Sequence, residues 1–298
     1  MTDRDPAADE ARSQGPWRFV THRLRRHPLG GYLVANSRRH RKGLLPHRVP
    51  DEQSAALPRR SRASAFLHLW APRRLAWWIA LLFAIGSALF ALGGVASSWP
   101  HAVAVPLRDA RLVGQVFFVG SLFFTTAAWL QWLEALNRDV STAMTADAPR
   151  VWRWFGWCPR NLGYLASAVQ LAGTLLFNFD TADAMLGGLS WRDEDLLVWT
   201  PDMLGSICFL VSSLLAYAEV CQGVWTLAPR SISWWIAVLN LLGSVAFQVS
   251  AFYSFASPGA AAPAALFWSA FNTAAGALCF LLASYLMVPE LFDGEAPS

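Results

Sequence analysis

Six long apolar runs divide the sequence and limit its possible folds more than any other feature. Each run has the roughly 20 residues that a helix needs to cross the ~30 Å hydrocarbon layer of a membrane. Backbone amides and carbonyls find no hydrogen-bond partner in lipid, so such runs form helices. Their continuous apolarity lacks the alternation of a β-barrel strand. The expected helices span residues 75–98, 113–135, 161–184, 197–221, 231–256 and 264–288.

Positive charge is concentrated before the first run. Sixteen of the 24 Lys and Arg residues lie there, although the formal net charge is only +4. Cytoplasmic segments of membrane proteins carry an excess of Lys and Arg, which predicts a cytoplasmic N-terminus. Six crossings return the C-terminus to the same side. Because Ala, Arg and Trp are abundant, we expect a bacterial source, and hence a multi-pass protein of the bacterial cytoplasmic (inner) membrane.

The apolar runs form an internal repeat of two-helix modules. Each copy begins with a Pro-Arg pair, and a Gly stands thirteen residues after the Arg in the first helix. A small hydroxyl residue follows this Gly directly, and a Phe stands four residues after it. In the second helix the Gly-small-x-x-Phe core recurs, and a Glu stands fourteen residues after the Gly. The first-helix sets are Pro72/Arg73/Gly86/Ser87/Phe90, Pro159/Arg160/Gly173/Thr174/Phe177 and Pro229/Arg230/Gly243/Ser244/Phe247. The second-helix sets are Gly120/Ser121/Phe124/Glu134, Gly205/Ser206/Phe209/Glu219 and Gly276/Ala277/Phe280/Glu290.

The repeat defines the expected domain organisation. We predict an all-α integral membrane protein whose six transmembrane helices form three tandem two-helix repeats in a pseudo-threefold bundle. A basic cytoplasmic region precedes them, partly disordered and with a short interfacial helix near 64–71. The expected segments are 1–71 (basic region), 72–134 (module 1), 135–158 (linker), 159–219 (module 2), 220–228 (linker), 229–290 (module 3) and 291–298 (tail).

The repeated Gly and Phe residues predict how the helices pack. At 100° per residue, the Phe and the Glu lie within about 40° of the Gly on either side, so the three form one stripe. A Gly beside a small residue lets two helices approach closely, and a Phe one turn away fills the facing groove. We therefore interpret Gly86, Gly120, Gly173, Gly205, Gly243 and Gly276 as helix-packing residues near the middle of the membrane.

The repeated Arg and Glu residues share one depth. Both lie about 20 Å to the cytoplasmic side of the Gly layer. Glu in a last helical turn and Arg in a first turn are disfavoured by the helix dipole, so each needs a compensating partner. We predict ion pairs between Arg73, Arg160 and Arg230 and the three Glu residues, within or between modules. The alternative is an acidic cytoplasmic mouth of Glu134, Glu219 and Glu290 that collects cations.

Polar residues inside the spans suggest a second candidate site. Asp180 lies close to the Gly173 stripe, and Asp202 lies at a similar depth near the outside. Asn178 and Gln248 occupy equivalent repeat positions, five residues after the Gly. Two buried carboxylates at one depth could hold a cation or share a proton. The simpler alternative is that these carboxylates are wetted from outside or cap a neighbouring helix.

Residues 16–74 mix Arg and Lys with large apolar side chains. Such a segment suits the anionic leaflet, where each basic residue near the surface contributes about 1 kcal/mol. We favour anionic lipid headgroups over nucleic acid as its partner, because the segment is tethered to a membrane and its periodicity is broken around Gly30 and Gly31. A protein partner is possible. The simplest alternative is a charged segment that only sets the topology.

Several chemistries lack support in the sequence. All six His residues lie outside the apolar runs, which argues against haem ligation inside the bundle. No phosphate-binding loop, dinucleotide Gly cluster, zinc-protease motif or nucleophile elbow occurs. The four Cys residues form no Cys-x-x-Cys motif and no disulfide framework. We therefore expect no catalytic residue, no metal site, no cofactor and no enzymatic activity.

The tandem two-helix module with Gly-Ser-x-x-Phe helices resembles the bacterial YrhK-like membrane domain. The resemblance covers residues 72–290 and implies no catalytic or binding residue. The sequence favours a structural or interaction bundle with a lipid- or partner-binding basic segment. The alternative is a small-cation or proton channel or transporter that uses the buried carboxylates. Three parallel repeats do not provide the inverted pair on which many transporters rock, which lowers the expectation of a transporter.

Overall fold

Six long helices account for most of the computed structural model. It describes residues 12–26, 31–44, 46–49, 66, 69–138, 152–221, 227–255 and 262–292. All six helices are long and apolar enough to cross a membrane. They are α2 (Leu75–Ser98), α3 (Ala110–Asn137), α4 (Leu162–Asp183), α6 (Thr200–Cys221), α7 (Ile232–Tyr253) and α8 (Pro263–Glu290).

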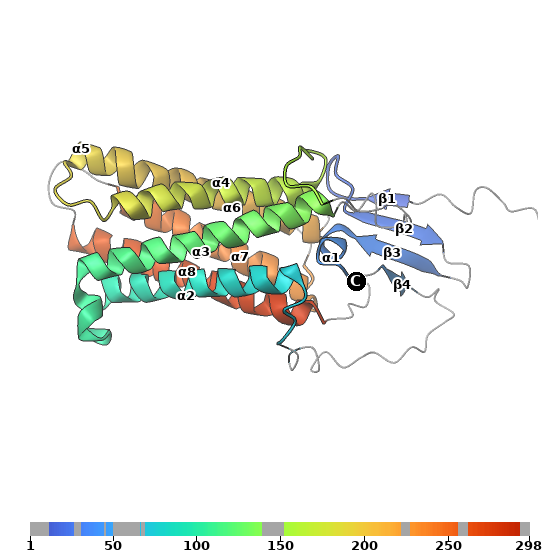
Figure 1. The fold of residues 1–298 in the computed structure, drawn as a ribbon, viewed down its shortest axis with the longest axis horizontal. Helices are drawn as coiled ribbons and strands as arrows, with labels where there is room; N and C mark the ends of the chain where they lie inside the picture. The colour runs from blue at the N-terminus through green and yellow to red at the C-terminus, as the bar shows by residue number, and fades with distance from the viewer. Residues whose placement is uncertain are drawn as a thin grey trace, which may run out of the picture.

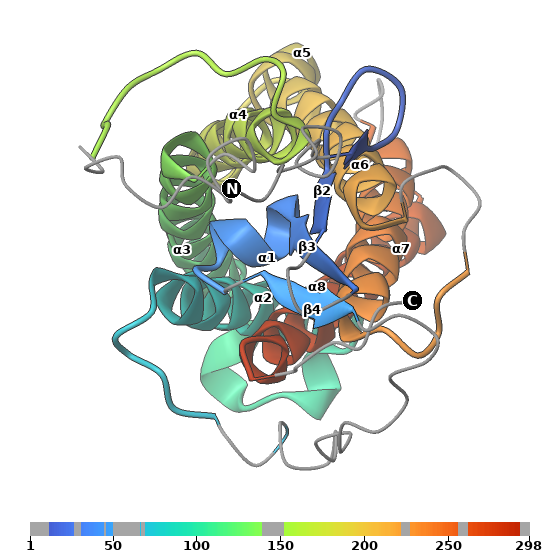
Figure 2. The ribbon, with the colours of Figure 1, turned by 90° about the vertical axis from the view of Figure 1, so that its right-hand side faces the viewer.

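The helices form a closed ring in chain order. Each packs against its neighbour in the sequence, and α8 closes the ring against α2 (Figure 2). The helix ends lie within three residues of the predicted ones, except that α6 continues a helical stretch begun by α5 (Trp191–Glu194) and the π-helical segment η6 (Asp195–Trp199). Two short 3-10 segments, η3 (Pro100–Ala102) and η4 (Val105–Arg108), join α2 to α3.

Side chains that cap the helices explain several of these starting points. Asn161 accepts a hydrogen bond from the Tyr164 amide at 3.1 Å, and Ser231 accepts one from the Trp234 amide at 3.4 Å. Such caps satisfy amides that have no partner within the helix. Helices α4 and α7 therefore begin three residues after Pro159 and Pro229, at Leu162 and Ile232.

The six repeated Gly residues lie where neighbouring helices approach closely. A Cβ on Gly86 would stand 3.0 Å from the Gly120 carbonyl oxygen, and one on Gly243 would stand 2.9 Å from that of Gly276. A Cβ on Gly173 would likewise stand 3.1 Å from the Gly205 carbonyl oxygen. The space for these contacts exists because neither partner carries a side chain.

A small antiparallel sheet lies at one end of the bundle (Figure 1). Its strands run in the order β1 (Arg12–Gln14), β2 (His22–Arg26), β3 (Tyr32–Asn36) and β4 (His47–Val49). The one-turn helix α1 (Ser37–Arg41) follows β3 directly and lies over the centre of the ring (Figure 2). We call the described residues before 50 the N-terminal arm and this end of the bundle the arm end.

The arm corrects one expectation, and another falls mostly outside the described residues. The chain is not all-α, because four strands form before residue 50. These strands and α1 lie in a region in which the sequence analysis expected partial disorder. The expected interfacial helix at 64–71 lies mostly outside the described residues, and the described residues 69–71 are not helical. Strands of three to five residues carry too little hydrophobic periodicity to stand out beside six membrane-length helices.

Candidate functional site

Six phenylalanines fill the centre of the bundle in two triangles. In one, the rings of Phe90, Phe177 and Phe247 lie 5.8–6.5 Å apart. In the other, those of Phe124, Phe209 and Phe280 lie 5.9–6.3 Å apart. Rings of the two triangles also contact each other, so both belong to one buried core.

The double triangle separates two cavities. One lies on the arm side and touches the triangle of Phe124, Phe209 and Phe280; its volume is about 70 Å³. The other lies towards the far end and touches the triangle of Phe90, Phe177 and Phe247; its volume is about 180 Å³. We call them the arm-side cavity and the far-side cavity. Both are lined by carboxylates as well as by aromatic rings, so the interior is polar above and below the phenylalanine layer.

Helix α1 closes the arm-side cavity through buried ion pairs. Arg41 donates two parallel hydrogen bonds of 3.0 Å to the Glu219 carboxylate. Arg38 donates through Nε to Glu290 Oε1 at 2.7 Å and through Nη2 to Oε2 at 3.2 Å. Lys42 also donates to Glu290. Charge-assisted hydrogen bonds of this fork geometry are among the strongest in proteins, so α1 is held firmly at the ring.

Hydroxyl groups complete the shells of two of these carboxylates. Ser37, the first residue of α1, donates to Glu219 Oε1 at 2.7 Å. Ser233 donates to Glu290 Oε1 at 2.6 Å. Glu219 and Glu290 are 1% and 4% exposed, so a carboxylate here is stable only because cations and hydroxyls surround it.

Local sequence places the α1 cations against the ring. Asn36 caps α1 by accepting from the Arg38 amide at 2.9 Å. Gly43 then ends the turn with a φ of +76°, a conformation that suits Gly. On the opposite side, a Cβ at Gly163 would overlap the Arg41 guanidinium and approach Glu219. The missing side chain of Gly163 thus leaves the space in which Arg41 reaches its partner.

The charge state of Lys42 is set by its burial. Desolvation by burial and the positive charge of Arg38 together lower the pKa of Lys42 from 10.5 to about 8, while Glu290 partly opposes both effects. A pKa near the physiological range makes Lys42 a group that exchanges protons readily.

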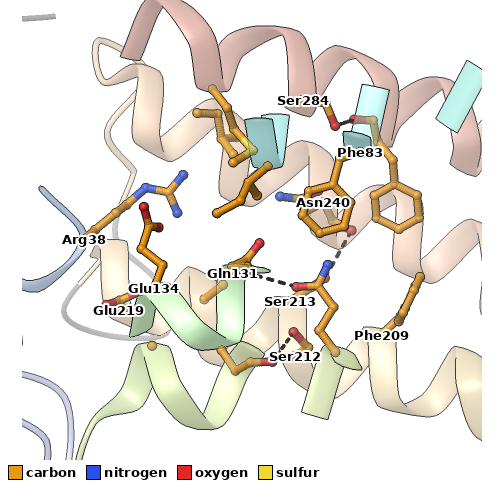
Figure 3. A pocket seen from close by; sticks show the side chains of 18 of the residues that line it. Arg38, Phe83, Gln131, Glu134, Phe209, Ser212, Ser213, Glu219, Asn240 and Ser284 are labelled. Carbon is orange, nitrogen blue, oxygen red and sulfur yellow. Dashed lines mark hydrogen bonds between the residues drawn. The ribbon is translucent and has the colours of Figure 1, made fainter. Parts of the chain in front are cut away.

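Glu134 differs from Glu219 and Glu290 in its surroundings. It is 5% exposed, yet among the residues that the structure describes none donates a hydrogen bond to its carboxylate or forms an ion pair with it. Figure 3 shows Glu134 and Arg38 pointing into the same end of the arm-side cavity. The cavity also presents the amides of Gln131, Gln170 and Asn240. The Gln131 amide nitrogen donates to Gln170 Oε1 at 3.3 Å.

The far-side cavity brings together two of the four residues of the predicted ion site. Asp180 and Asp202 both line it, beside the hydroxyl residues Thr181, Ser250, Ser269 and Thr273. Asp202 also accepts a hydrogen bond from Ser254 at 3.1 Å. Asn178 and Gln248 do not line this cavity. Asn178 accepts from Thr125 at 3.1 Å, and the Gln248 amide points to the Met203 sulfur at 2.8 Å.

The predicted pairing of repeat arginines with repeat glutamates is wrong for Glu219 and Glu290. Arg73, Arg160 and Arg230 are exposed in the turns just before α2, α4 and α7. Side chains there reach water at no cost, whereas the glutamates face inward at the ends of α6 and α8. Their partners are Arg38, Arg41 and Lys42 instead. These three cations point into the protein and do not lie on a lipid surface.

Sequence reasoning did not identify α1 as part of the site. A signal was present: Arg38, Arg41 and Lys42 stand at i, i+3 and i+4, the spacing that places side chains on one helical face. Matching that face to three inward glutamates at one depth would have required knowing that residues 37–41 are helical. Among the described residues, no group of three or more His, Cys, Asp or Glu side chains is placed to hold a metal ion.

Comparisons with known proteins identify no relative of this chain. No protein-family model, no curated protein and no solved structure matches the chain. The resemblance of residues 72–290 to YrhK-like domains stays a prediction, and the function is argued from the two cavities and the ion-paired arm.

Proposed function

We propose that the bundle is a pathway for small cations across a membrane, described here in a closed state. The observation that supports this function best is the pair of carboxylate-lined cavities at the centre of the ring, on opposite sides of the phenylalanine layer. Ionisable groups inside membrane bundles are costly and most often line ion routes. This geometry favours the conduit over the interaction bundle that the sequence favoured.

The far-side cavity supports a preference for cations. Asp180 and Asp202 supply two carboxylates, and the other residues that line this cavity carry no charge. A cavity lined by one sign of charge with apolar walls raises the local concentration of ions of the opposite sign. Hydroxyl oxygens from Ser250, Ser269 and Thr273 add neutral ligands, so a cation entering from this end meets several oxygen atoms.

The phenylalanine layer supports a closed state. Its rings are 4–7% exposed and pack against one another, which leaves an apolar barrier between the cavities. Apolar constrictions in channels stop conduction by excluding water and open when they become wet. In this proposal, passage requires the two triangles to separate.

The arm supports the assignment of the arm end to the cytoplasm. It carries much of the basic sequence that precedes α2, and basic segments are retained in the cytoplasm. The proposed contact with anionic lipid then rests on exposed arm residues such as Arg25 and Arg26, because Arg38, Arg41 and Lys42 bind glutamates.

Cation flux into liposomes tests the proposed function. The protein is reconstituted as wild type and as Phe247→Ala, which removes one ring from the barrier and should increase flux. Adding Asp180→Asn and Asp202→Asn to Phe247→Ala should abolish that increase. Glu194→Gln is the matched control, because Glu194 is an exposed carboxylate on α5 at the far end.

A folded Phe247→Ala protein that passes no cation would overturn the pathway. The packed interaction bundle is the second candidate, and one observation favours it: the phenylalanines fill the centre while the ion pairs fix the arm. Under that function, the same substitutions lower thermal stability and leave flux at the level of empty liposomes.

A further inference from the structure

Among the described residues, the arm forms ion pairs with two of three equivalent carboxylates and leaves the third without a hydrogen bond or ion pair. Glu219 binds Arg41, and Glu290 binds Arg38 and Lys42. Glu134 is also more than nine-tenths buried, but none of the described residues hydrogen-bonds to it or pairs with it. A buried carboxylate without a hydrogen bond is unfavourable unless water, a cation or a proton reaches it. The position of Glu134 therefore points to a ligand.

The space in front of Glu134 suits water. The arm-side cavity has a volume of about 70 Å³ and offers the polar groups of Gln131, Gln170 and Asn240. A water molecule needs about 10–15 Å³ of such volume and two to four polar partners, so several waters fit. These waters would connect Glu134 to the side chains of α1 on one side and to the phenylalanine layer on the other (Figure 3).

We infer that the conducted ion is a proton and that Glu134 is its binding site on the arm side of the phenylalanine layer. This inference rests on the proposed function and names its substrate. The step is a proton transfer through water: an O–H bond of a water in the arm-side cavity breaks as an O–H bond forms on Glu134, a proton from Lys42 restores that water, and the carboxyl later returns its proton to water.

The charges around Glu134 favour a proton over an alkali ion. Glu134, Glu219, Arg38, Arg41 and Lys42 line the cavity, and Glu290 pairs with Arg38 and Lys42, so three carboxylates balance three cations in this cluster. Arg138 adds a further positive charge near Glu134. An alkali ion would add positive charge that nothing offsets. A proton gained by Glu134 can be matched by one lost from Lys42, since the two groups interact and face the same cluster.

Lys42 is suited to that exchange. Its pKa of about 8 allows it to lose and regain a proton near physiological pH. In the transfer, an N–H bond of Lys42 breaks, water carries the proton to Glu134, and the neutral amine is reprotonated from the cytoplasm. Asp180 and Asp202 are the acceptors beyond the phenylalanine layer.

The apolar character of the phenylalanine layer also favours a proton over an alkali ion. An alkali ion would have to shed most of its hydration shell between the two triangles, and the layer offers only aromatic rings in exchange. A proton crosses as soon as a single file of waters forms. The rings therefore reject hydrated metal ions more strongly than protons.

Two measurements on the full-length protein test the inference. Infrared difference spectra, recorded from pH 5 to pH 9, should show the carbonyl stretch of a protonated carboxylic acid that is missing in Glu134→Gln. In liposomes with Phe247→Ala as the background, proton flux should exceed sodium and potassium flux. Adding Glu134→Gln should lower proton flux by about 100-fold or more, the usual scale for a lost proton-transfer group. Glu194→Gln should change neither readout.

A second variant, Asn240→Leu, tests the inference if Glu134→Gln fails to fold, because it changes the lining of the arm-side cavity without removing a charge. It should dry the arm-side cavity and also lower proton flux. Sodium or potassium flux above proton flux, or full proton flux in folded Glu134→Gln, would overturn the inference. So would the absence of the infrared band at every pH. A clear band without flux of any cation would keep Glu134 as a proton site and reject the pathway, so the two failures are distinguishable.

Discussion

Replacing Arg41 by Gln should release α1 from the end of the bundle. Glu219 is 1% exposed, and its charge is matched by the two 3.0 Å hydrogen bonds from Arg41. Removing one partner of a buried ion pair typically costs about 3–5 kcal/mol, because the remaining charge stays in a medium of low dielectric. Ser37 offers Glu219 a single neutral hydrogen bond, which is too weak to replace the cation.

Hydrogen exchange measures this loss where it occurs. At 1.36 kcal/mol for each factor of ten, the population of undocked α1 should rise roughly 100- to 5,000-fold. Amide protection in residues 31–42 should fall by that factor, while protection inside α6 and α7 should change little. Local opening and global unfolding are separable in this way because they expose different amides.

Two further variants decide whether the reasoning is right. Arg230→Gln removes an exposed cation at the same end of the bundle and should leave protection of α1 unchanged. Arg41→Gln combined with Glu219→Gln removes both charges and should recover much of the loss. Unchanged protection in Arg41→Gln, or an equal loss in Arg230→Gln, would refute the buried pairing and restore the sequence-based one.

Two more outcomes follow from the structure. Gly243→Ala places a Cβ 2.9 Å from the Gly276 carbonyl oxygen and should destabilise the bundle by about 1–3 kcal/mol in thermal unfolding. Gly187→Ala meets open space and should not, so an equal loss in both would contradict close packing at Gly243. Docking of the arm buries Lys42 and lowers its pKa from 10.5 to about 8, so docking releases a proton between these pH values. The stability of wild type relative to Lys42→Gln should therefore rise as pH increases from about 8 towards 10.5, and a fall in thermal-shift measurements would show the opposite sign.

The helices could be predicted from the sequence because lipid removes the alternatives. An apolar run of membrane length has one backbone solution, so α2 begins and ends at the expected residues. The Gly-small-x-x-Phe spacing likewise places Gly and Phe on one face of any helix. The contacts between Gly243 and Gly276 and the central ring of Phe247 follow from that geometry.

The arm could not be predicted in the same way. Its strands and its one-turn helix are too short for a hydrophobic period to build up, and their stability comes from contacts with distant residues. The pairing of Arg160 with a glutamate was argued from equal depth and from the helix dipole, which say nothing of where a side chain points. Depth does not fix direction, and a residue in the turn before a helix can point outward, as Arg160 does.

The modules differ at a repeat position that lies against two of the three glutamates. Ten residues before the Gly of each first helix stand Ala76, Gly163 and Ser233. Gly163 leaves room for Arg41 beside Glu219, and Ser233 donates a hydrogen bond to Glu290. Ala76 is buried, and its side chain has no hydrogen-bonding group. The module that carries Ala76 is the one whose glutamate, Glu134, has no partner among the described residues. With this divergence between the modules, α1 binds the carboxylates of Glu219 and Glu290 and leaves that of Glu134 facing the arm-side cavity.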